Sequence, residues 1–228
     1  MFTGSTQTGT LISQILASRG GDQVPLIAET GGQNCMIVDS TALPEQVVDD
    51  VIASGFQSAG QRCSALRILF LQEDIADSVT DMLIGALSEL HIGDPALLST
   101  DIGPVIDQKA LKTLNKHVED MQGKAKLLYE CKVENMPADA TFFAPRLYQL
   151  DNINVLQREV FGPCVHIIRF NSKDLPQVIE QINSTGFGLT MGVHSRIEER
   201  ALELARLSRA GNVYINRNMI GAIVGVQP

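Results

Sequence analysis

The amino-acid sequence predicts an α/β fold, a three-layer sandwich in which helices cover both faces of a mostly parallel sheet. Apolar runs of strand length alternate with amphipathic stretches of helical length from end to end, and this alternation is typical of such folds. The 228 residues are 44% hydrophobic and 19% charged, which is a globular balance. The longest apolar run, counting glycine, covers residues 219–226, far short of the roughly 20 residues of a membrane-spanning helix. We therefore expect one α/β domain without a membrane segment.

Each element is predicted from its caps and its apolar pattern. Ser5 caps a first helix that has no strand before it, and Gly20 and Gly21 end this helix. Pro44 opens the second helix, because proline is favoured in a first helical turn. Residues 131–141 have the composition of an exposed loop. The other expected elements are strands at 26–28, 35–38, 68–71, 127–129, 165–170, 189–193 and 213–215, and helices at 75–90, 111–121, 175–182 and 197–207.

Charge and cysteine content exclude several classes of function. The chain has 18 Lys and Arg against 26 Asp and Glu, and this net charge of −8 argues against binding nucleic acid or an anionic membrane surface. The four cysteines have no CxxC spacing and the four histidines are scattered, which argues against a disulfide framework and a metal site. We expect a reducing, cytoplasmic compartment.

Both ends of the chain have the pattern of an interrupted domain. The first helix begins almost at residue 1, and the last residues follow an apolar stretch directly, whereas natural domains usually end in polar residues. The alternative is that both termini pack against the core. We expect a fold truncated at both ends.

Cys63 is the strongest candidate nucleophile. Small, flexible neighbours let backbone amides approach a reacting atom, and Arg62 beside it favours a thiolate. The alternative is a small core residue, which is the usual role of a lone cysteine. We keep that alternative for Cys35, Cys131 and Cys164.

Two glutamates follow or precede predicted strands in glycine-containing turns. Glu29 comes after the strand at 26–28, where a general base would lie at the carboxyl edge of a parallel sheet; a solvated glutamate is an equally good interpretation. Glu159 precedes the strand at 165–170, with Phe161 two residues later, so this pair could hold ribose hydroxyls and a flat ring. A salt-bridged loop glutamate is the alternative. Gly4 and Ser5, at a helix start, form a weak phosphate-binding signal.

Four motifs in this order resemble those of the NAD-dependent aldehyde dehydrogenases. They are FTGST (2–6), ETGGQN (29–34), GQRC (60–63) and EVFGP (159–163). The resemblance implies the catalytic domain of that family from 24 to 228 and a remnant of its dinucleotide-binding domain from 1 to 23. It also implies that Cys63 attacks the aldehyde, that Glu29 is the general base and that Glu159 and Phe161 hold the nicotinamide end of NAD. Gly4 and Ser5 would lie near the pyrophosphate.

Three stretches resemble a narrower group, the bifunctional proline-catabolic members that oxidise L-glutamate γ-semialdehyde to glutamate. They are AETGGQN (28–34), IVDSTAL (37–43) and NRNMIGAIVGVQP (216–228). The resemblance implies that Ser64, Gly221 and Ala222 anchor the α-carboxylate and amine end of the substrate. It further implies a flavin-dependent proline dehydrogenase domain, with its FAD, elsewhere in the parent chain, and a homo-oligomeric parent.

Two other functions stay open. The chain could act on a different aldehyde, or it could be a non-catalytic module of this family, although a scaffold has no need of both Cys63 and Glu29. The resemblance also implies that the family's oxyanion-hole asparagine belongs to the part of the dinucleotide-binding domain upstream of residue 1. Since losing one such donor typically lowers the rate by about 10²- to 10³-fold, we expect the chain alone to be inactive and to bind NAD weakly.

Overall fold

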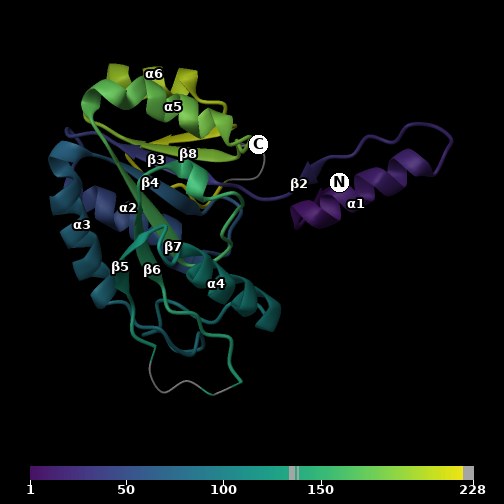
Figure 1. Ribbon diagram of the computed structural model, residues 1–228, viewed down its shortest axis with the longest axis horizontal. Helices are drawn as coiled ribbons and strands as arrows, with labels where there is room; N and C mark the ends of the chain where they lie inside the picture. Colours follow the sequence, from purple (N-terminus) through teal and green to yellow (C-terminus); the bar gives the residue numbers. More distant parts are fainter. Residues whose placement is uncertain (134–136, 138, 223–228) are drawn as a thin grey trace.

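The computed structural model describes residues 1–133, 137 and 139–222. Its main sheet has seven strands in the order β5-β6-β7-β4-β3-β8-β9 (Figure 1). Only the pair β5 and β6 at one end of this sheet is antiparallel. The predicted mostly parallel sheet is therefore confirmed. The strands are β3 (Asn34–Val38), β4 (Leu66–Gln72), β5 (Lys126–Glu130), β6 (Arg146–Leu150), β7 (Cys164–Phe170), β8 (Thr190–His194) and β9 (Asn212–Ile215).

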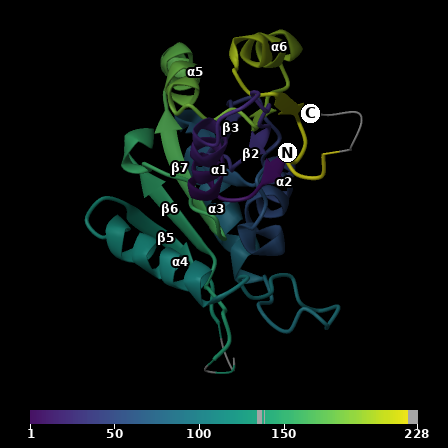
Figure 2. The same ribbon diagram turned by 90° about the vertical axis from the view of Figure 1, so that its right-hand side faces the viewer.

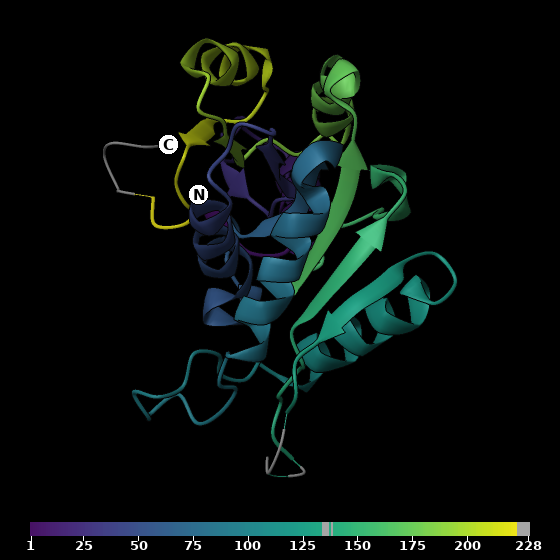
Figure 3. The same ribbon diagram turned by 90° about the vertical axis from the view of Figure 1, so that its left-hand side faces the viewer.

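Side chains of β7 show that helices cover both faces of the sheet. Arg169 reaches Glu73 and Asp77 of α3, whereas the Nε2 atom of His166 lies 3.0 Å from that of His117 in α4. Because odd- and even-numbered side chains of a strand point to opposite faces, α3 and α4 lie on opposite faces. Figure 3 shows α2 and α3 side by side, and Figure 2 shows α4 across β5 and β6. The helices of this body are α2 (Pro44–Phe56), α3 (Glu73–Ser88), α4 (Gln108–Met121), α5 (Leu175–Ser184) and α6 (Glu198–Leu207).

The core of the molecule is built around β3 and β4. All residues of both strands are buried, which explains why their sequences are nearly continuous apolar runs. In the described part of the chain, no helix has both the length and the apolarity required to cross a membrane.

The N-terminal part corrects two expectations. Strand β1 (Phe2–Thr3) precedes α1 (Thr6–Ser18), so the expectation of no strand there was wrong. It pairs in parallel with β2 (Ala28–Glu29), and these two strands form a small separate sheet beside α1 (Figure 1). The strand expected at 26–28 therefore lies at residues 28–29, outside the main sheet. Strands of two residues are too short to show a periodicity in the sequence.

Two further corrections concern the region around the predicted exposed loop. Strand β6 was missed, although it lies between β5 and β7 in the sheet. Cys131 is buried, and its thiol donates a hydrogen bond to the Leu87 carbonyl at 3.3 Å, so the segment 131–141 is not exposed at its start. Residues 134–136 and 138 of that segment lie outside the described residues. Short 3₁₀ turns complete the fold: η1 (Gln57–Gly60), η2 (Ile153–Val155) and η3 (Ser172–Asp174).

Candidate active site

The loops singled out from the sequence meet at one edge of the main sheet. Cys63 and Ser64 precede β4, Glu159 and Phe161 precede β7, and residues 31–33 precede β3. These three strands are neighbours and run parallel, so their preceding loops lie at the same, amino-terminal edge.

Glu29 lies on the amino-terminal side as well, which corrects its expected place at the carboxyl edge. The residue is part of β2, and the chain enters the main sheet only at Asn34, where β3 begins. Glu29 is the last residue of β2, so it lies at the carboxyl end of the small parallel sheet, and the expectation was wrong only for the main sheet, to which β2 does not belong. Glu29 is exposed.

All four cysteines lie within the described residues, and among them only Cys63 is exposed. It follows an unusual turn in which Ser58, Ala59 and Gly60 all have positive φ, at 55°, 51° and 64°. This left-handed conformation is unfavourable for residues with a side chain, so the surrounding structure must hold it. A Cβ atom on Gly60 would collide with the Gly162 carbonyl. The chain thus turns sharply between α2 and β4 and presents Cys63 at the surface.

Asn34 holds the backbone at Cys63 and just after it. Its Nδ2 atom donates to the carbonyl oxygens of Cys63 and Ala65 at 2.7 and 2.9 Å, and its Oδ1 atom accepts from the Thr190 amide at 3.2 Å. Gly32 lies so close that a Cβ atom there would be 2.7 Å from the Cys63 carbonyl oxygen. In the sequence, Asn34 was noted only as the last residue of the motif at 29–34, and this role was not predicted.

Arg67 joins the Cys63 loop to the Glu159 loop. Its side chain is 1% exposed, and its guanidinium lies 5.4 Å from the centre of the Phe161 ring. Sequence reasoning missed it, although a charge inside an apolar strand is a usable signal. Nη1 donates to the carbonyls of Gly60 (2.7 Å) and Gly162 (3.2 Å), and Nη2 donates to the Arg62 carbonyl (3.1 Å) and Glu159 Oε1 (3.3 Å).

The Glu159 carboxylate is half-buried beside the Cys63 loop. Burial raises its pKa, against the opposing effects of Arg67 and of a hydrogen bond from the Gly32 backbone. Gly31 has a φ of +112°, and a Cβ atom at that position would collide with the carboxylate. Phe161, two residues on, is 42% exposed. The backbone at Gly31 is therefore shaped around Glu159.

Glu29 lines a cavity of about 500 Å³ at the same edge. The cavity lies between the start of α1, the β2 strand and the segments that lead into β8 and β9. Its lining residues are Thr6, Ala28, Glu29, Thr30, Gly31, Gly186, Phe187, Gly188, Leu189, Gly211 and Asn212.

The other predicted site residues are distributed over three places. Gly4 and Ser5 are exposed at the N-terminus of α1, where the Ser5 Oγ atom accepts from the Thr8 amide at 3.2 Å. The carbonyl of Ser64 accepts from Thr190 Oγ1 at 3.3 Å. Gly221 and Ala222 are exposed after β9. Among the described residues, no three His, Cys, Asp or Glu side chains are grouped as metal ligands.

The model of the aldehyde dehydrogenase family matches residues 1–228. The chain belongs to this family. The chain is 52% identical over 236 residues to the bifunctional protein PutA of Escherichia coli (strain K12), covering 100% of this chain and 18% of that protein. It is 36% identical to the 1-pyrroline-5-carboxylate dehydrogenase of Geobacillus kaustophilus (strain HTA426), covering 100% of this chain and 44% of that protein.

Solved structures resemble the fold of the chain over its whole length. A crystal structure of bifunctional proline utilization A (PutA) has a TM-score of 0.95 at 50% identity, covering 100% of this chain and 23% of that one. A 1-pyrroline-5-carboxylate dehydrogenase from Thermus with bound NAD has a TM-score of 0.88 at 32% identity, covering 100% of this chain and 44% of that one. The chain thus spans less than half the length of these relatives.

Proposed function

We propose that the chain carries the catalytic part of an NAD-dependent enzyme that oxidises L-glutamate γ-semialdehyde to glutamate in proline catabolism. The observation that supports this most is Cys63, whose exposed thiol lies on a turn held by Asn34 and Arg67. A thiol exposed on an otherwise rigid loop is suited to nucleophilic attack. Relatives that match the whole chain are named bifunctional proline utilization A (PutA) or 1-pyrroline-5-carboxylate dehydrogenase.

In the proposed reaction, the Cys63 thiolate attacks the aldehyde carbon and forms a thiohemiacetal. The nicotinamide of NAD, held by Glu159 and Phe161, would supply the acceptor for the hydride, and loss of the hydride from the thiohemiacetal leaves a thioester on Cys63. Glu29 takes a proton from the water that attacks this thioester. The C–S bond breaks, glutamate leaves, and the Cys63 thiolate is restored.

The residues around the site fit the nicotinamide cofactor. The carboxylate of Glu159 faces a backbone that has no side chain at Gly31, and Phe161 presents an exposed ring nearby. We propose that both hold the nicotinamide end. Gly4 and Ser5 would contact the pyrophosphate at the N-terminus of α1, where free backbone amides favour an anion.

For the substrate, we propose that Ser64 and the backbone of Gly221 and Ala222 bind the α-carboxylate and amine end. We also propose that the chain works within a longer, homo-oligomeric cytoplasmic protein, joined to a proline dehydrogenase domain that binds FAD. The chain covers 18% of the length of PutA and 44% of that of a 1-pyrroline-5-carboxylate dehydrogenase, and this partial coverage supports a longer parent protein. In this protein, residues 1–23 would belong to the dinucleotide-binding domain and 24–228 to the catalytic domain.

NADH formation by the complete protein tests the proposal. With glutamate γ-semialdehyde and NAD, the Cys63→Ala variant is expected to form no NADH. The Glu29→Gln variant is expected to form one NADH per site in a rapid burst, followed by slow turnover, because hydride transfer precedes the step that Glu29 serves. Full turnover by the Glu29→Gln variant would contradict the assignment of the base.

A further inference from the structure

The segment 216–219 runs beside helix α2 toward the edge of the sheet that holds Cys63. It leaves β9 at the carboxyl edge, where the Asn216 amide donates to the Val193 carbonyl at 2.9 Å. Helix α2 follows β3 and ends at Phe56, shortly before Cys63. The segment and the helix therefore run in the same direction, from the carboxyl edge of the main sheet toward its amino-terminal edge.

Three polar side chains of α2 hold the backbone of this segment. Gln46, Asp50 and Ser54 are spaced four residues apart, so they share one face of the helix and rise about 6 Å at each step. Each holds the segment at a successive point. Gln46 Nε2 donates to the Asn216 carbonyl (2.8 Å), Asn218 hydrogen-bonds Asp50 through its backbone and side chain, and the Met219 amide donates to Ser54 Oγ (3.0 Å).

Met219 fixes the segment against the sheet. Its side chain is completely buried, and it fills space over Gly192 of β8. A Cβ atom at Gly192 would lie 3.0 Å from the Met219 sulfur and 3.1 Å from the Met36 methyl carbon. The absence of a side chain at Gly192 is therefore what admits Met219.

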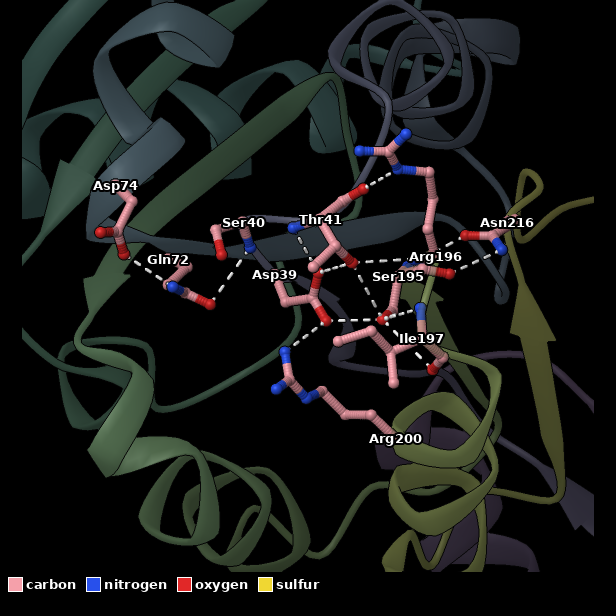
Figure 4. Close-up of polar contacts among 10 residues, drawn as sticks. All are labelled: Asp39, Ser40, Thr41, Gln72, Asp74, Ser195, Arg196, Ile197, Arg200 and Asn216. Atoms are coloured by element: carbon pink, nitrogen blue, oxygen red, sulfur yellow. Dashed lines mark hydrogen bonds and ion pairs between the residues drawn. The ribbon is translucent and has the colours of Figure 1, made fainter.

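The start of the segment is fixed by a second set of contacts, shown in Figure 4. Asn216 has a φ of 52°, and its side chain both accepts from the Ser195 amide (3.0 Å) and donates to the Ser195 carbonyl (2.9 Å). The Ser195 hydroxyl donates to Asp39, which also receives Arg200 at 3.0 Å. Burial would raise the pKa of Asp39, but hydrogen bonds from Ser195, Thr41 and Arg200 hold it below its usual value. Asp39 therefore stays ionised, and its hydrogen bond with Ser195 fixes the residue that holds Asn216.

We propose that Gln46, Asp50 and Ser54 are positioning residues for substrate recognition. By holding residues 216–219, they set where Gly221 and Ala222 present their backbone to the carboxylate end of the aldehyde. The inference rests on the proposed function, since it takes these two residues as the substrate anchor. Asp50 is the central contact: it lies in the middle of the three, is 14% exposed, and has His194 Nε2 3.4 Å from its Oδ2 atom.

The test compares two aldehydes in the complete protein. Asp50→Ala is expected to raise the KM for glutamate γ-semialdehyde about tenfold while kcat changes less than about twofold. With butanal, which has neither an α-carboxylate nor an amine, kcat/KM is expected to stay at the parent value. Asp50→Asn keeps an oxygen that accepts from Asn218, so it should restore most of the lost affinity.

Asp49→Ala is the matched control, because Asp49 is the exposed neighbour on the same helix and should leave both KM values unchanged. If Asp50→Ala does not fold, Gln46→Ala, at an exposed position, provides the same comparison. An unchanged KM for the semialdehyde, or equal losses with both aldehydes, overturns the inference alone. A parent protein that does not oxidise the semialdehyde overturns the proposed function, and the inference with it.

Discussion

The guanidinium of Arg67 and the carboxylate of Glu159 lie 3.3 Å apart, although 92 residues of sequence separate them. Arg67 is 1% exposed at its side chain and Glu159 17%. Burial lowers the pKa of Arg67, and the nearby Glu159 opposes this effect. Since Arg67 also holds the carbonyls of Gly60 and Arg62, one buried cation orients both the loop before Cys63 and the loop that carries Glu159.

Replacing Arg67 with methionine is expected to lower the free energy of unfolding by about 3–5 kcal/mol. Methionine fills a similar space but removes the ion pair with the partly buried Glu159 and the side-chain donor to the carbonyls of Gly60, Arg62 and Gly162. Urea denaturation followed by circular dichroism measures the loss.

Arg169→Met is the matched control for that substitution. Arg169 bonds Glu73 and Asp77 near the surface, where ion pairs contribute little, so the expected loss is below about 1 kcal/mol. Equal losses from both variants would contradict the central role of Arg67.

Limiting iodoacetamide is expected to label Cys63 before the other cysteines. Cys35, Cys131 and Cys164 are buried, and burial raises the pKa of Cys131 to about 11 and that of Cys164 to about 12. Peptide mass spectrometry gives the order of labelling, and the urea-denatured protein, in which all four thiols are open, is the control. Early labelling of Cys131 in the native protein would contradict the assignment.

The protein is expected to lose stability as the pH falls from about 6.5 to about 4. Burial lowers the pKa of His117 to about 4, of His166 to about 3 and of His194 to about 4. In this range the unfolded chain binds protons that the folded chain does not, so each histidine lowers the free energy of unfolding by up to about 1.4 kcal/mol per pH unit.

Urea denaturation at a series of pH values checks this slope. His166→Gln should reduce it, because this variant removes one buried imidazole. His91→Gln should leave the slope unchanged, because the His91 side chain is 76% exposed. A slope that is the same in all three proteins would show that other groups cause the acid sensitivity.

Gly60→Ala is expected to destabilise the protein by about 3 kcal/mol or more. The substitution combines an unfavourable positive φ of 64° with a collision against the Gly162 carbonyl. Gly85→Ala tests the opposite case, because Gly85 is an exposed residue of α3 with open space around it. There alanine should stabilise the protein by about 0.5–1 kcal/mol. Thermal unfolding of both variants measures the difference, and a tolerated alanine at 60 would show that the turn before Cys63 can relax.

Much of the fold was predictable from the sequence, because its strong signals are local. The cap at Ser5, the proline at 44 and the apolar runs of β4 and β7 depend on neighbours a few residues away. The strand β6 was not predicted, although it lies between β5 and β7 in the sheet. It consists of five residues with two polar side chains, Arg146 and Gln149, and follows a segment of exposed composition. Its place in the sheet comes from its partners and not from its own pattern.

The sequence by itself determined the α/β class, the order of most elements and the choice of Cys63, Glu29 and Glu159 as candidates. Only the tertiary structure decided that their loops meet at the amino-terminal edge and that Arg67 and Asn34 hold the Cys63 backbone. It also decided that α2 supports the segment before Gly221. Residues such as Arg67 and Glu159, or Gln46 and Asn216, are too far apart along the chain to leave a shared local pattern. Their contacts arise only when sheet order and helix packing bring separate loops together.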